Sequence, residues 1–241
     1  ISIENEYFRK PLTGLWKNHN SYNQDDFFCG DAAGRKDDFS DTDLLYALNL
    51  NIKFLTPEEL FLEQKVEIQY NMPDILTRYI GKNENIILPK LDKLLILMCG
   101  YPGSGKSYLS KLINIPIVSN DIQGNKSKCK KKLIEYLKKD NKIIIDNTNH
   151  TLENRSEYIN IAKNYQYHTV IIYINNDINF CYYMNQYRCE KSKGNKKLIS
   201  KIAYYTLRKN FAIPVKEECD TFIDYTNKVD KSLFEYKFPL L

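Results

Sequence analysis

The centre of this chain is an eight-residue stretch, Gly100-Tyr101-Pro102-Gly103-Ser104-Gly105-Lys106-Ser107. It follows an apolar run at residues 94–99 and precedes a helix-like pattern, the setting in which G-x-x-x-x-G-K-S forms a phosphate-binding loop. Glycines let backbone N–H groups turn inward around phosphate oxygens, and the following helix adds its positive end. Lys106 then reaches the β- and γ-phosphates, and the Ser107 hydroxyl can bind Mg²⁺. The stretch therefore predicts a site for ATP, or another nucleoside triphosphate, with Mg²⁺.

Apolar runs and helix-like runs alternate from residue 93 onward. Strands that alternate with helices of this length predict βα units around a central parallel sheet. The β-branched run at residues 143–145 suits a strand that is buried on both faces. We therefore expect an α/β fold with a central parallel sheet that carries the phosphate-binding loop in this part of the chain.

Two aspartates follow strand-like runs in the same segment. Asp121 comes shortly after residues 116–119, and Asp146 ends residues 142–146. The carboxyl ends of parallel strands meet at one edge of a sheet, so we expect both carboxylates near the loop. One can accept the proton of an attacking hydroxyl, and the other can orient Mg²⁺ or the Lys106 side chain. For Asp121 a second interpretation, the N-cap of a helix, stays open.

Composition excludes several classes of protein. The chain has 241 residues, of which 43% are hydrophobic and 27% charged, the balance of a globular protein rather than a disordered one. No apolar run approaches the roughly 20 residues that span a bilayer, and no secretory signal is visible, so we expect no membrane partner. The six cysteines include no C-x-x-C pair, which predicts buried free thiols in an intracellular, reducing location. The net charge of +5 permits a nucleic-acid partner without requiring one.

A second group of motifs precedes the loop. It comprises Arg9-Lys10-Pro11, Gly14-Leu15-Trp16, Gly30-Asp31-Ala32-Ala33-Gly34-Arg35, the acidic stretch at residues 37–43, and Thr56-Pro57-Glu58-Glu59. Together these motifs resemble the C-terminal half of the 3′-phosphatase domain of polynucleotide kinase 3′-phosphatases, which belongs to the haloacid-dehalogenase superfamily. The resemblance implies that Asp31 binds Mg²⁺ and that Lys10 steadies the phosphate and the nucleophilic aspartate. A cation and a metal ion together neutralise charge on a transferring phosphoryl group.

The nucleophile of that family is an aspartate in a D-x-D-G-T motif, which this chain does not contain. Asp41-Thr42-Asp43 has the D-x-D spacing, but polar residues rather than a strand precede it, so we reject it as the nucleophile. We expect a fragment of a longer protein rather than a degenerate phosphatase, without phosphatase activity from these residues alone. For Asp37, Asp38 and Asp43 we expect a solvated acidic loop and helix cap.

The phosphate-binding loop belongs to a second and closer resemblance. It is carried, in order, by Gly100 to Ser107, Val118-Ser119-Asn120-Asp121, Asp146-Asn147-Thr148-Asn149 with Arg155, Asn185 to Arg188, and Arg208-Lys209 with Phe211 and Pro214. These motifs are similar in order and spacing to the 5′-kinase domain of the same polynucleotide kinase 3′-phosphatases. The resemblance implies that Asp121 is the general base, that Lys106 and Ser107 hold phosphates and Mg²⁺, and that Arg188 neutralises transition-state charge from a lid.

Four further residues are expected to support the site, and two positions depart from the family's pattern. The residues expected to support the site are Asp146, Asn147, Asn149 and Arg155. Asn120 stands where the family usually has an arginine before the catalytic aspartate, and Gln186 stands where it often has a second lid arginine. Both departures weaken the expected phosphate contacts. For Arg188 the alternative is a cation favoured by the helix dipole at a helix C-terminus.

The sequence thus divides into three expected parts. Residues 1–64 are an incomplete haloacid-dehalogenase-like phosphatase segment, residues 65–92 are a connector, and residues 93–241 are a P-loop polynucleotide 5′-hydroxyl kinase. The expected function is ATP-dependent phosphorylation of 5′-hydroxyl ends of DNA or RNA, within a bifunctional 5′-kinase/3′-phosphatase for strand-break repair. In a eukaryote we expect it in the nucleus. Two alternatives stay open: a P-loop kinase of a small-molecule acceptor, and a nucleotide-dependent end-binding module with little catalysis.

Overall fold

The chain forms two compact units, each assembled from segments that are distant in sequence. The computed structural model describes residues 6–17, 23, 25–139 and 141–241. The first unit comprises residues 1–81, 182–200 and 229–241, and the second comprises residues 82–181 and 201–228. The chain therefore leaves the first unit, builds most of the second, and returns to the first twice.

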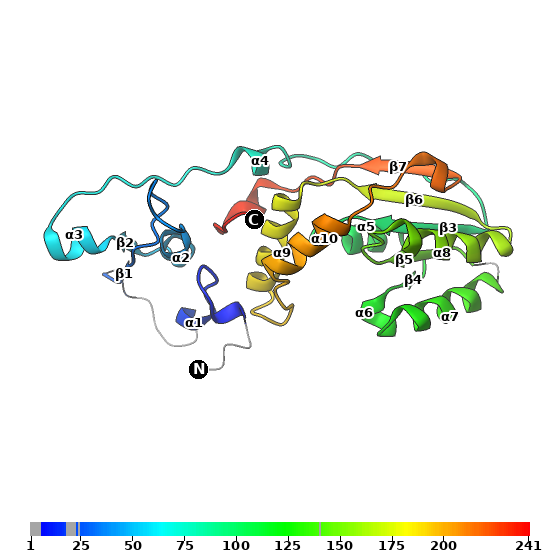
Figure 1. The fold of residues 1–241 in the computed structure, drawn as a ribbon, viewed down its shortest axis with the longest axis horizontal. Coiled ribbons are helices and arrows are strands. Elements are labelled where there is room, and N and C mark those ends of the chain that lie inside the picture. Colours follow the sequence, from blue (N-terminus) through cyan, green and yellow to red (C-terminus); the bar gives the residue numbers. More distant parts are fainter. Residues whose placement is uncertain (1–5, 18–22, 24, 140) are drawn as a thin grey trace. The chain divides into compact units, whose positions relative to one another are not determined.

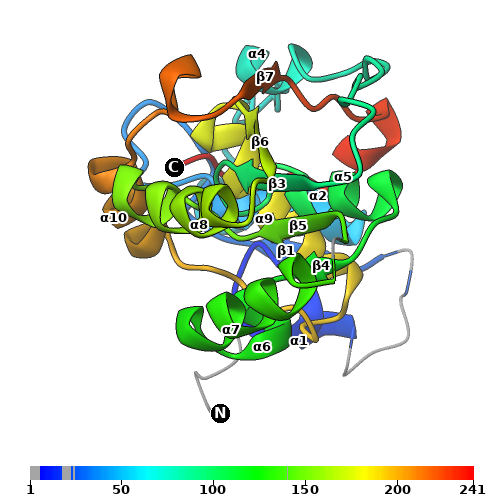
Figure 2. The same cartoon turned by 90° about the vertical axis from the view of Figure 1, so that its right-hand side faces the viewer.

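The second unit is built on a five-stranded sheet. Its strands are β3 (Leu94–Cys99), β4 (Ile117–Val118), β5 (Ile143–Asp146), β6 (His168–Ile174) and β7 (Thr221–Tyr225). Their order is β4-β5-β3-β6-β7, and every neighbouring pair is parallel. The central position of β3 can be followed in Figure 1 and Figure 2. All six side chains of β3 are buried, which confirms the predicted parallel sheet covered on both faces.

Helices α5 (Lys106–Ile113), α7 (Lys126–Leu137) and α8 (Leu152–Asn164) pack on the two faces of this sheet. The same unit contains α6 (Asn120–Gln123), α10 (Lys201–Asn210) and a 3-10 turn at Lys216–Glu218. Leu95 and Leu97 of β3 share a core with side chains of α7 and α8. Ile96 and Met98 share a second core with Leu109 of α5. Alternate residues of the central strand thus enter opposite cores, because successive side chains of a strand point to opposite faces.

The first unit contains a two-stranded parallel sheet and short helices. Strands β1 (Phe27–Cys29) and β2 (Lys53–Leu55) pair in parallel. The other elements are α1 (Gly14–Lys17), α2 (Thr42–Leu50), α3 (Pro57–Leu62), α4 (Asp74–Thr77) and 3-10 turns at Glu6–Phe8 and Lys231–Phe234. Helix α3 begins with a capping box, since the Thr56 hydroxyl accepts from the Glu59 amide and the Glu59 carboxylate accepts from the Thr56 amide. Both contacts satisfy N–H groups at the start of the helix.

Late residues of the chain complete the first unit. Helix α9 (Ile178–Lys191) begins in the second unit and ends in the first. Its Glu190 carboxylate accepts a hydrogen bond from the Thr13 amide at 2.9 Å, and the Asn49 side chain donates to the Lys237 carbonyl at 2.8 Å. These late segments fall in the range 93–241 that the sequence assigned to the kinase, so the compact units do not follow the expected ranges. The division into 1–64, 65–92 and 93–241 stays a prediction about homologous domains.

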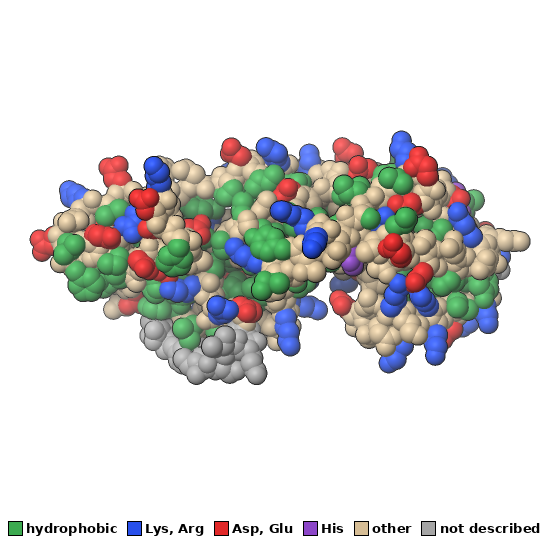
Figure 3. Space-filling model, viewed as in Figure 1, with side chains coloured by type: hydrophobic (Ala, Val, Ile, Leu, Met, Phe, Trp, Pro, Cys, Tyr) green, Lys and Arg blue, Asp and Glu red, His purple; other side chains and the backbone are tan. Residues whose placement is uncertain are grey.

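Cysteine chemistry and surface charge can be compared with the expectations from composition. All six cysteines are free; four are buried, and Cys29 and Cys219 are partly exposed. Within the described residues, no helix combines the length and the apolar content that crossing a bilayer requires. Lys and Arg side chains are interspersed with Asp and Glu on the face shown in Figure 3, in keeping with the mild net charge of +5.

Candidate functional site

The phosphate-binding loop joins β3 to α5 at the carboxyl edge of the sheet. Its glycines adopt backbone angles that other residues rarely reach, with φ of +148° at Gly100, +80° at Gly103 and +100° at Gly105. A Cβ at Gly100 would lie 2.9 Å from the Ile174 carbonyl oxygen, and one at Gly105 would lie 2.5 Å from the Asn227 amide nitrogen. The loop therefore requires glycine at these positions for both conformation and space.

Lys106 is folded back over the loop that it follows. Its side chain is buried, and its ammonium donates to the carbonyl of Gly100 at 2.9 Å and to that of Tyr101 at 2.7 Å. The Ser104 hydroxyl lies 3.5 Å from the same ammonium. These contacts hold the cation directly at the loop, within reach of any phosphate that the loop binds.

Asp146, at the end of β5, lies beside the start of α5. Burial raises the pKa of Asp146 above its ordinary value, and the charge of Asp121 acts in the same direction. A hydrogen bond from Ser107 and the positive charge of Lys106 oppose this rise. The structure thus brings Lys106, Ser107, Asp121 and Asp146 into one electrostatic neighbourhood, as the strand ends predicted.

These side chains suit a magnesium ion. The described part of the chain contains no group of three or more His, Cys, Asp or Glu residues suited to holding a metal. Mg²⁺ does not require such a cage, because it commonly takes one or two protein oxygens and completes its shell with substrate phosphates and water. The Ser107 hydroxyl and the Asp146 carboxylate offer two oxygens of this kind beside the loop.

Asp121 lies in the first turn of α6 and is exposed. Its helix is positioned by neighbours: the Ser119 hydroxyl accepts from the Ile122 amide at 3.3 Å, and the Asn147 side chain accepts from the Asn120 amide at 2.8 Å. The interpretation of Asp121 as the helix N-cap is wrong, because Ser119 is the N-cap. The Asp121 carboxylate is therefore not used by its own helix.

The predicted supporting residues Asn147 and Asn149 connect the loop to the acidic side of the site. Asn149 is buried, has a φ of +44°, and donates to the Met98 carbonyl at 2.8 Å. The neighbouring Thr148 carbonyl accepts from the Gly100 amide at 3.3 Å. This segment fixes the first residues of the loop, while Asn147 fixes the helix that carries Asp121.

Arg155, the fourth supporting residue, is a buried clamp. Its guanidinium forms two hydrogen bonds with Glu218, at 2.6 and 2.8 Å. It also donates to the carbonyls of Asn149 at 3.0 Å and Ala212 at 2.8 Å. Its exposed fraction is 0%, so Arg155 organises the backbone around the site rather than meeting a ligand.

Arg188 and Gln186 lie in the part of α9 that belongs to the first unit, whereas the phosphate-binding loop belongs to the second. Arg188 is exposed in the last turn of the helix and donates to the Asn185 side chain at 3.1 Å. Gln186 is buried and donates to the Pro239 carbonyl at 2.9 Å. The position expected to hold a second lid arginine is thus occupied by a buried anchor for the C-terminal residues.

The phosphatase-like residues of the first unit gather after β1. Asp31 follows the strand and is exposed. Lys10 forms an ion pair with Asp43, and the Asp43 carboxylate also accepts from the Ala32 amide at 3.2 Å. A solvated Asp43 was expected; this is wrong, because its exposed fraction is only 4%. The Lys10 partner, 33 residues earlier in the chain, gives the sequence no local signal for this burial.

Asp38 also differs from the expected solvated loop, whereas Asp37 is exposed. The Asp38 carboxylate accepts from the amides of Ala33 and Arg35, each at 3.0 Å, and pairs with the Arg35 guanidinium. These bonds lower the pKa of Asp38 below its ordinary value, chiefly through the Arg35 side chain. Asp38 therefore holds the shape of the loop that follows Asp31.

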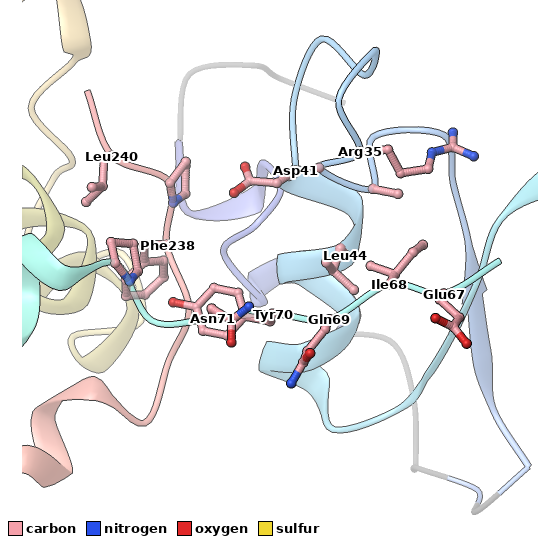
Figure 4. A pocket seen from close by; sticks show the side chains of 14 residues that line it. Arg35, Asp41, Leu44, Glu67, Ile68, Gln69, Tyr70, Asn71, Phe238 and Leu240 are labelled. Carbon is pink, nitrogen blue, oxygen red and sulfur yellow. The ribbon is translucent and has the colours of Figure 1, made fainter.

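A pocket of about 540 Å³ lies in the first unit, and Figure 4 shows the side chains around it. Its lining includes Arg35, Asp41, Tyr70 and Phe238. None of the residues predicted for catalysis or nucleotide binding lines it. The Arg35 guanidinium is already engaged by Asp38 and Glu58, so the pocket offers no free cation for a phosphate from this residue.

Three residues that sequence reasoning did not assign to the site contact the loop. The Tyr204 hydroxyl donates to the Pro102 carbonyl at 2.7 Å, and the Phe211 ring lies 4.7 Å from that of Tyr101, centroid to centroid. Asn227 lies against Gly105. Each lies more than 100 residues after its partner in the loop. Phe211 lies in a motif of the sequence resemblance that gave it no role, and no motif marks Tyr204 or Asn227.

The second unit is a P-loop α/β protein, because its parallel sheet has a phosphate-binding loop between the central strand and a helix. The family model described as Polynucleotide kinase 3 phosphatase matches residues 1–61, and that described as Chromatin associated protein KTI12 matches residues 117–233.

Two relatives match almost the whole chain. A bifunctional polynucleotide phosphatase/kinase of Acanthamoeba polyphaga mimivirus is 33% identical over 98% of this chain and 66% of its own length. One of Schizosaccharomyces pombe is 33% identical over 92% of this chain and 58% of its own length. The chain is thus a homologue of the bifunctional polynucleotide phosphatase/kinases, as its motifs predicted, and it spans less than two thirds of the length of these relatives.

Solved structures resemble part of this chain more distantly. Kti12 of Chaetomium thermophilum, in complex with ADP-AlF3, is 16% identical, with 58% of this chain and 92% of that chain covered and a TM-score of 0.44. A gluconokinase of Sinorhizobium meliloti is 11% identical, with 60% and 86% covered and a TM-score of 0.39.

Proposed function

We propose that this chain transfers the γ-phosphate of ATP to the 5′-hydroxyl end of a nucleic acid. The observation that carries this proposal is the placement of Asp121 and Asp146 at the same sheet edge as Lys106 and Ser107. A cation and a hydroxyl on the donor side, opposite an unengaged carboxylate on the acceptor side, are the parts that phosphoryl transfer to an alcohol needs. The homology to polynucleotide phosphatase/kinases supplies the class of acceptor.

Each residue then has a defined task. The loop amides bind the phosphates, and Lys106 exchanges the carbonyls of Gly100 and Tyr101 for phosphate oxygens. Ser107 and Asp146 hold Mg²⁺, which supplies neutralising charge for the phosphoryl group when bound. Asp121 accepts the proton of the 5′-hydroxyl, a role that its exposed position leaves open.

Arg188 is proposed to supply a further positive charge from a lid helix during transfer. Its exposure at the end of α9 supports this role, since among the described residues the guanidinium forms a hydrogen bond only with the Asn185 side chain. Asn120 offers no charge beside Asp121, and Gln186 is used elsewhere. We therefore expect weaker phosphate contacts than a site with arginines at both positions would have.

The first unit is proposed to be the C-terminal part of a 3′-phosphatase. In that role Asp31 binds Mg²⁺ and Lys10 steadies both the phosphate and the attacking aspartate. The ion pair of Lys10 with the buried Asp43 supports the proposal, because it holds a cation at the end of β1. Phosphatase activity is expected only in a chain that also carries the D-x-D-G-T motif.

The kinase proposal is tested with labelled ATP and three kinds of acceptor. We expect label to enter a 5′-hydroxyl oligonucleotide in the presence of Mg²⁺, and excess mononucleotide or sugar to leave this transfer unchanged. Label entering only the small acceptors would contradict the proposal in favour of a small-molecule kinase. Binding of ATP and oligonucleotide ends without transfer in a single turnover would contradict it in favour of an end-binding module.

A further inference from the structure

A hydrogen bond from Tyr204 links helix α10 to the phosphate-binding loop. The Tyr204 side chain is fully buried. Its hydroxyl donates to the carbonyl of Pro102 at 2.7 Å and lies 3.2 Å from that of Cys181. All three residues belong to the second unit, so this contact fixes which face of α10 is turned toward the loop.

The residues just after α10 also pack against this loop. The Phe211 ring packs against Tyr101 at 4.7 Å and against Tyr173 of β6 at 6.2 Å, measured between centroids. The Ala212 amide donates to the His150 carbonyl at 2.8 Å. The last turn of α10 is therefore held between two attachment points, one at Tyr204 and one at Phe211.

Arg208 lies between these two attachment points. It follows Tyr204 by four residues, and residues four apart in a helix share a face. Its side chain is exposed, and no ion pair or hydrogen bond of this guanidinium occurs within the described residues. Burial raises the pKa of Tyr101, and the charge of Arg208 partly offsets that rise, which places the guanidinium near the loop.

Arg208 and the two aspartates lie on opposite sides of the central strand β3. Asp146 ends β5 and Asp121 comes after β4, and both strands lie on one side of β3 in the sheet order. Phe211 packs on Tyr173 of β6, on the other side of β3. The cation thus lies away from the carboxylates that would meet the acceptor.

We propose that Arg208 binds a phosphate of the donor nucleotide held by the loop. This inference rests on the proposed nucleotide site. It adds a cation that lies in the same unit as the loop, which Arg188 does not. Arginine suits the role because its guanidinium is always charged and its donors match phosphate oxygens two at a time.

The test compares Arg208→Gln with Lys209→Gln. Lys209 is the next residue, is also exposed, and is rotated off the face shared with Tyr204, so it controls for the loss of one surface charge. We expect Arg208→Gln to weaken direct binding of ATP and ADP by roughly 10- to 100-fold, the usual effect of a lost charged hydrogen bond. Lys209→Gln should leave both affinities unchanged, and Arg208→Lys should show an intermediate loss. Adenosine binding should not change in any variant.

Several results would overturn the proposal. They are unchanged ATP affinity in Arg208→Gln, an equal loss in Lys209→Gln, or an equal loss for adenosine, which would indicate a contact with the nucleoside. A matching thermal unfolding temperature shows that the variant is folded. Because binding is measured without an acceptor, a chain that binds ATP through Arg208 but transfers nothing to 5′-hydroxyl ends would refute the proposed kinase and leave this inference standing.

Discussion

At the residue scale, the candidate site places the carboxyl group of Asp146 in surroundings that disfavour its charge. Burial raises the pKa of Asp146, and the nearby charge of Asp121 adds to this effect. Only the Ser107 hydrogen bond and the charges of Lys106 and Lys111 act in the opposite direction. Without a bound cation, such a group lowers the stability of the fold at neutral pH. Functional sites commonly keep such costs because the ligand relieves them.

Asp146→Asn is therefore expected to raise the thermal unfolding temperature in the absence of nucleotide and Mg²⁺, while abolishing phosphoryl transfer. The folded-state pKa lies above the unfolded value, so the gain is present at neutral pH and disappears as the pH falls through the folded-state pKa. Asp121→Asn is the matched control: Asp121 is exposed, so its replacement removes only its charge beside Asp146 and should raise the unfolding temperature by less than Asp146→Asn does. An Asp146→Asn protein less stable than the parent at neutral pH would contradict this account.

Individual residues show which features of the site could be predicted from the sequence. The loop was predictable because one contiguous motif contains its glycines and its lysine. The burial of Asp43 was not, because it depends on Lys10, which lies 33 residues away. The roles of Tyr204 and Phe211 were not predictable for the same reason, since their partners at Pro102 and Tyr101 lie more than 100 residues earlier.

At the scale of elements, helix starts position the chemistry. Ser119, Asn125 and Thr151 are the N-caps of α6, α7 and α8, and each side chain accepts from a backbone amide of its helix. The alternation of strands and helices was predictable from apolar runs. The exact direction in which α6 presents Asp121 was not, because it depends on the hydrogen bond between Asn120 and Asn147.

Removing two of these cap side chains distinguishes an effect on the position of Asp121 from an effect on the stability of the protein. Ser119→Ala and Asn125→Ala should each destabilise the protein by about 1 kcal/mol, the usual cost of losing an N-cap side chain. Only Ser119→Ala should also lower the rate of phosphoryl transfer, because α6 carries Asp121, whereas ATP affinity should stay unchanged in both. The measurements are urea unfolding, single-turnover transfer and direct ATP binding. Equal transfer rates in the two variants would show that the cap of α6 has no part in placing Asp121.

At the scale of the whole molecule, two compact units share one chain in an order that the sequence did not reveal. Residues 182–200 and 229–241 belong with residues 1–81. Glu190 is central to this arrangement: it is buried, and its carboxylate meets the Thr13 amide, the Thr13 hydroxyl and the Lys17 ammonium, the last at 3.0 Å. The first unit therefore contains the phosphatase-like segment together with part of the kinase-like segment.

Glu190→Gln is expected to loosen the first unit by about 1–3 kcal/mol, since an amide puts a donor where the carboxylate accepted from other donors. Hydrogen exchange at the Thr13 amide should accelerate in the variant. Glu135→Gln serves as the control because Glu135 forms an exposed ion pair with Lys132 in the second unit, and it should leave Thr13 exchange unchanged. Parental protection of the Thr13 amide in Glu190→Gln would count against this role.

The central claim is that Asp121 faces a nucleoside triphosphate as the acceptor of the 5′-hydroxyl proton. Its most direct test is single-turnover transfer of labelled γ-phosphate from ATP to a 5′-hydroxyl oligonucleotide, with the parent chain and Asp121→Asn compared at saturating ATP. The account predicts transfer by the parent and, in Asp121→Asn, a rate lower by roughly 100-fold or more with ATP affinity unchanged. Transfer by Asp121→Asn at the parental rate would contradict it.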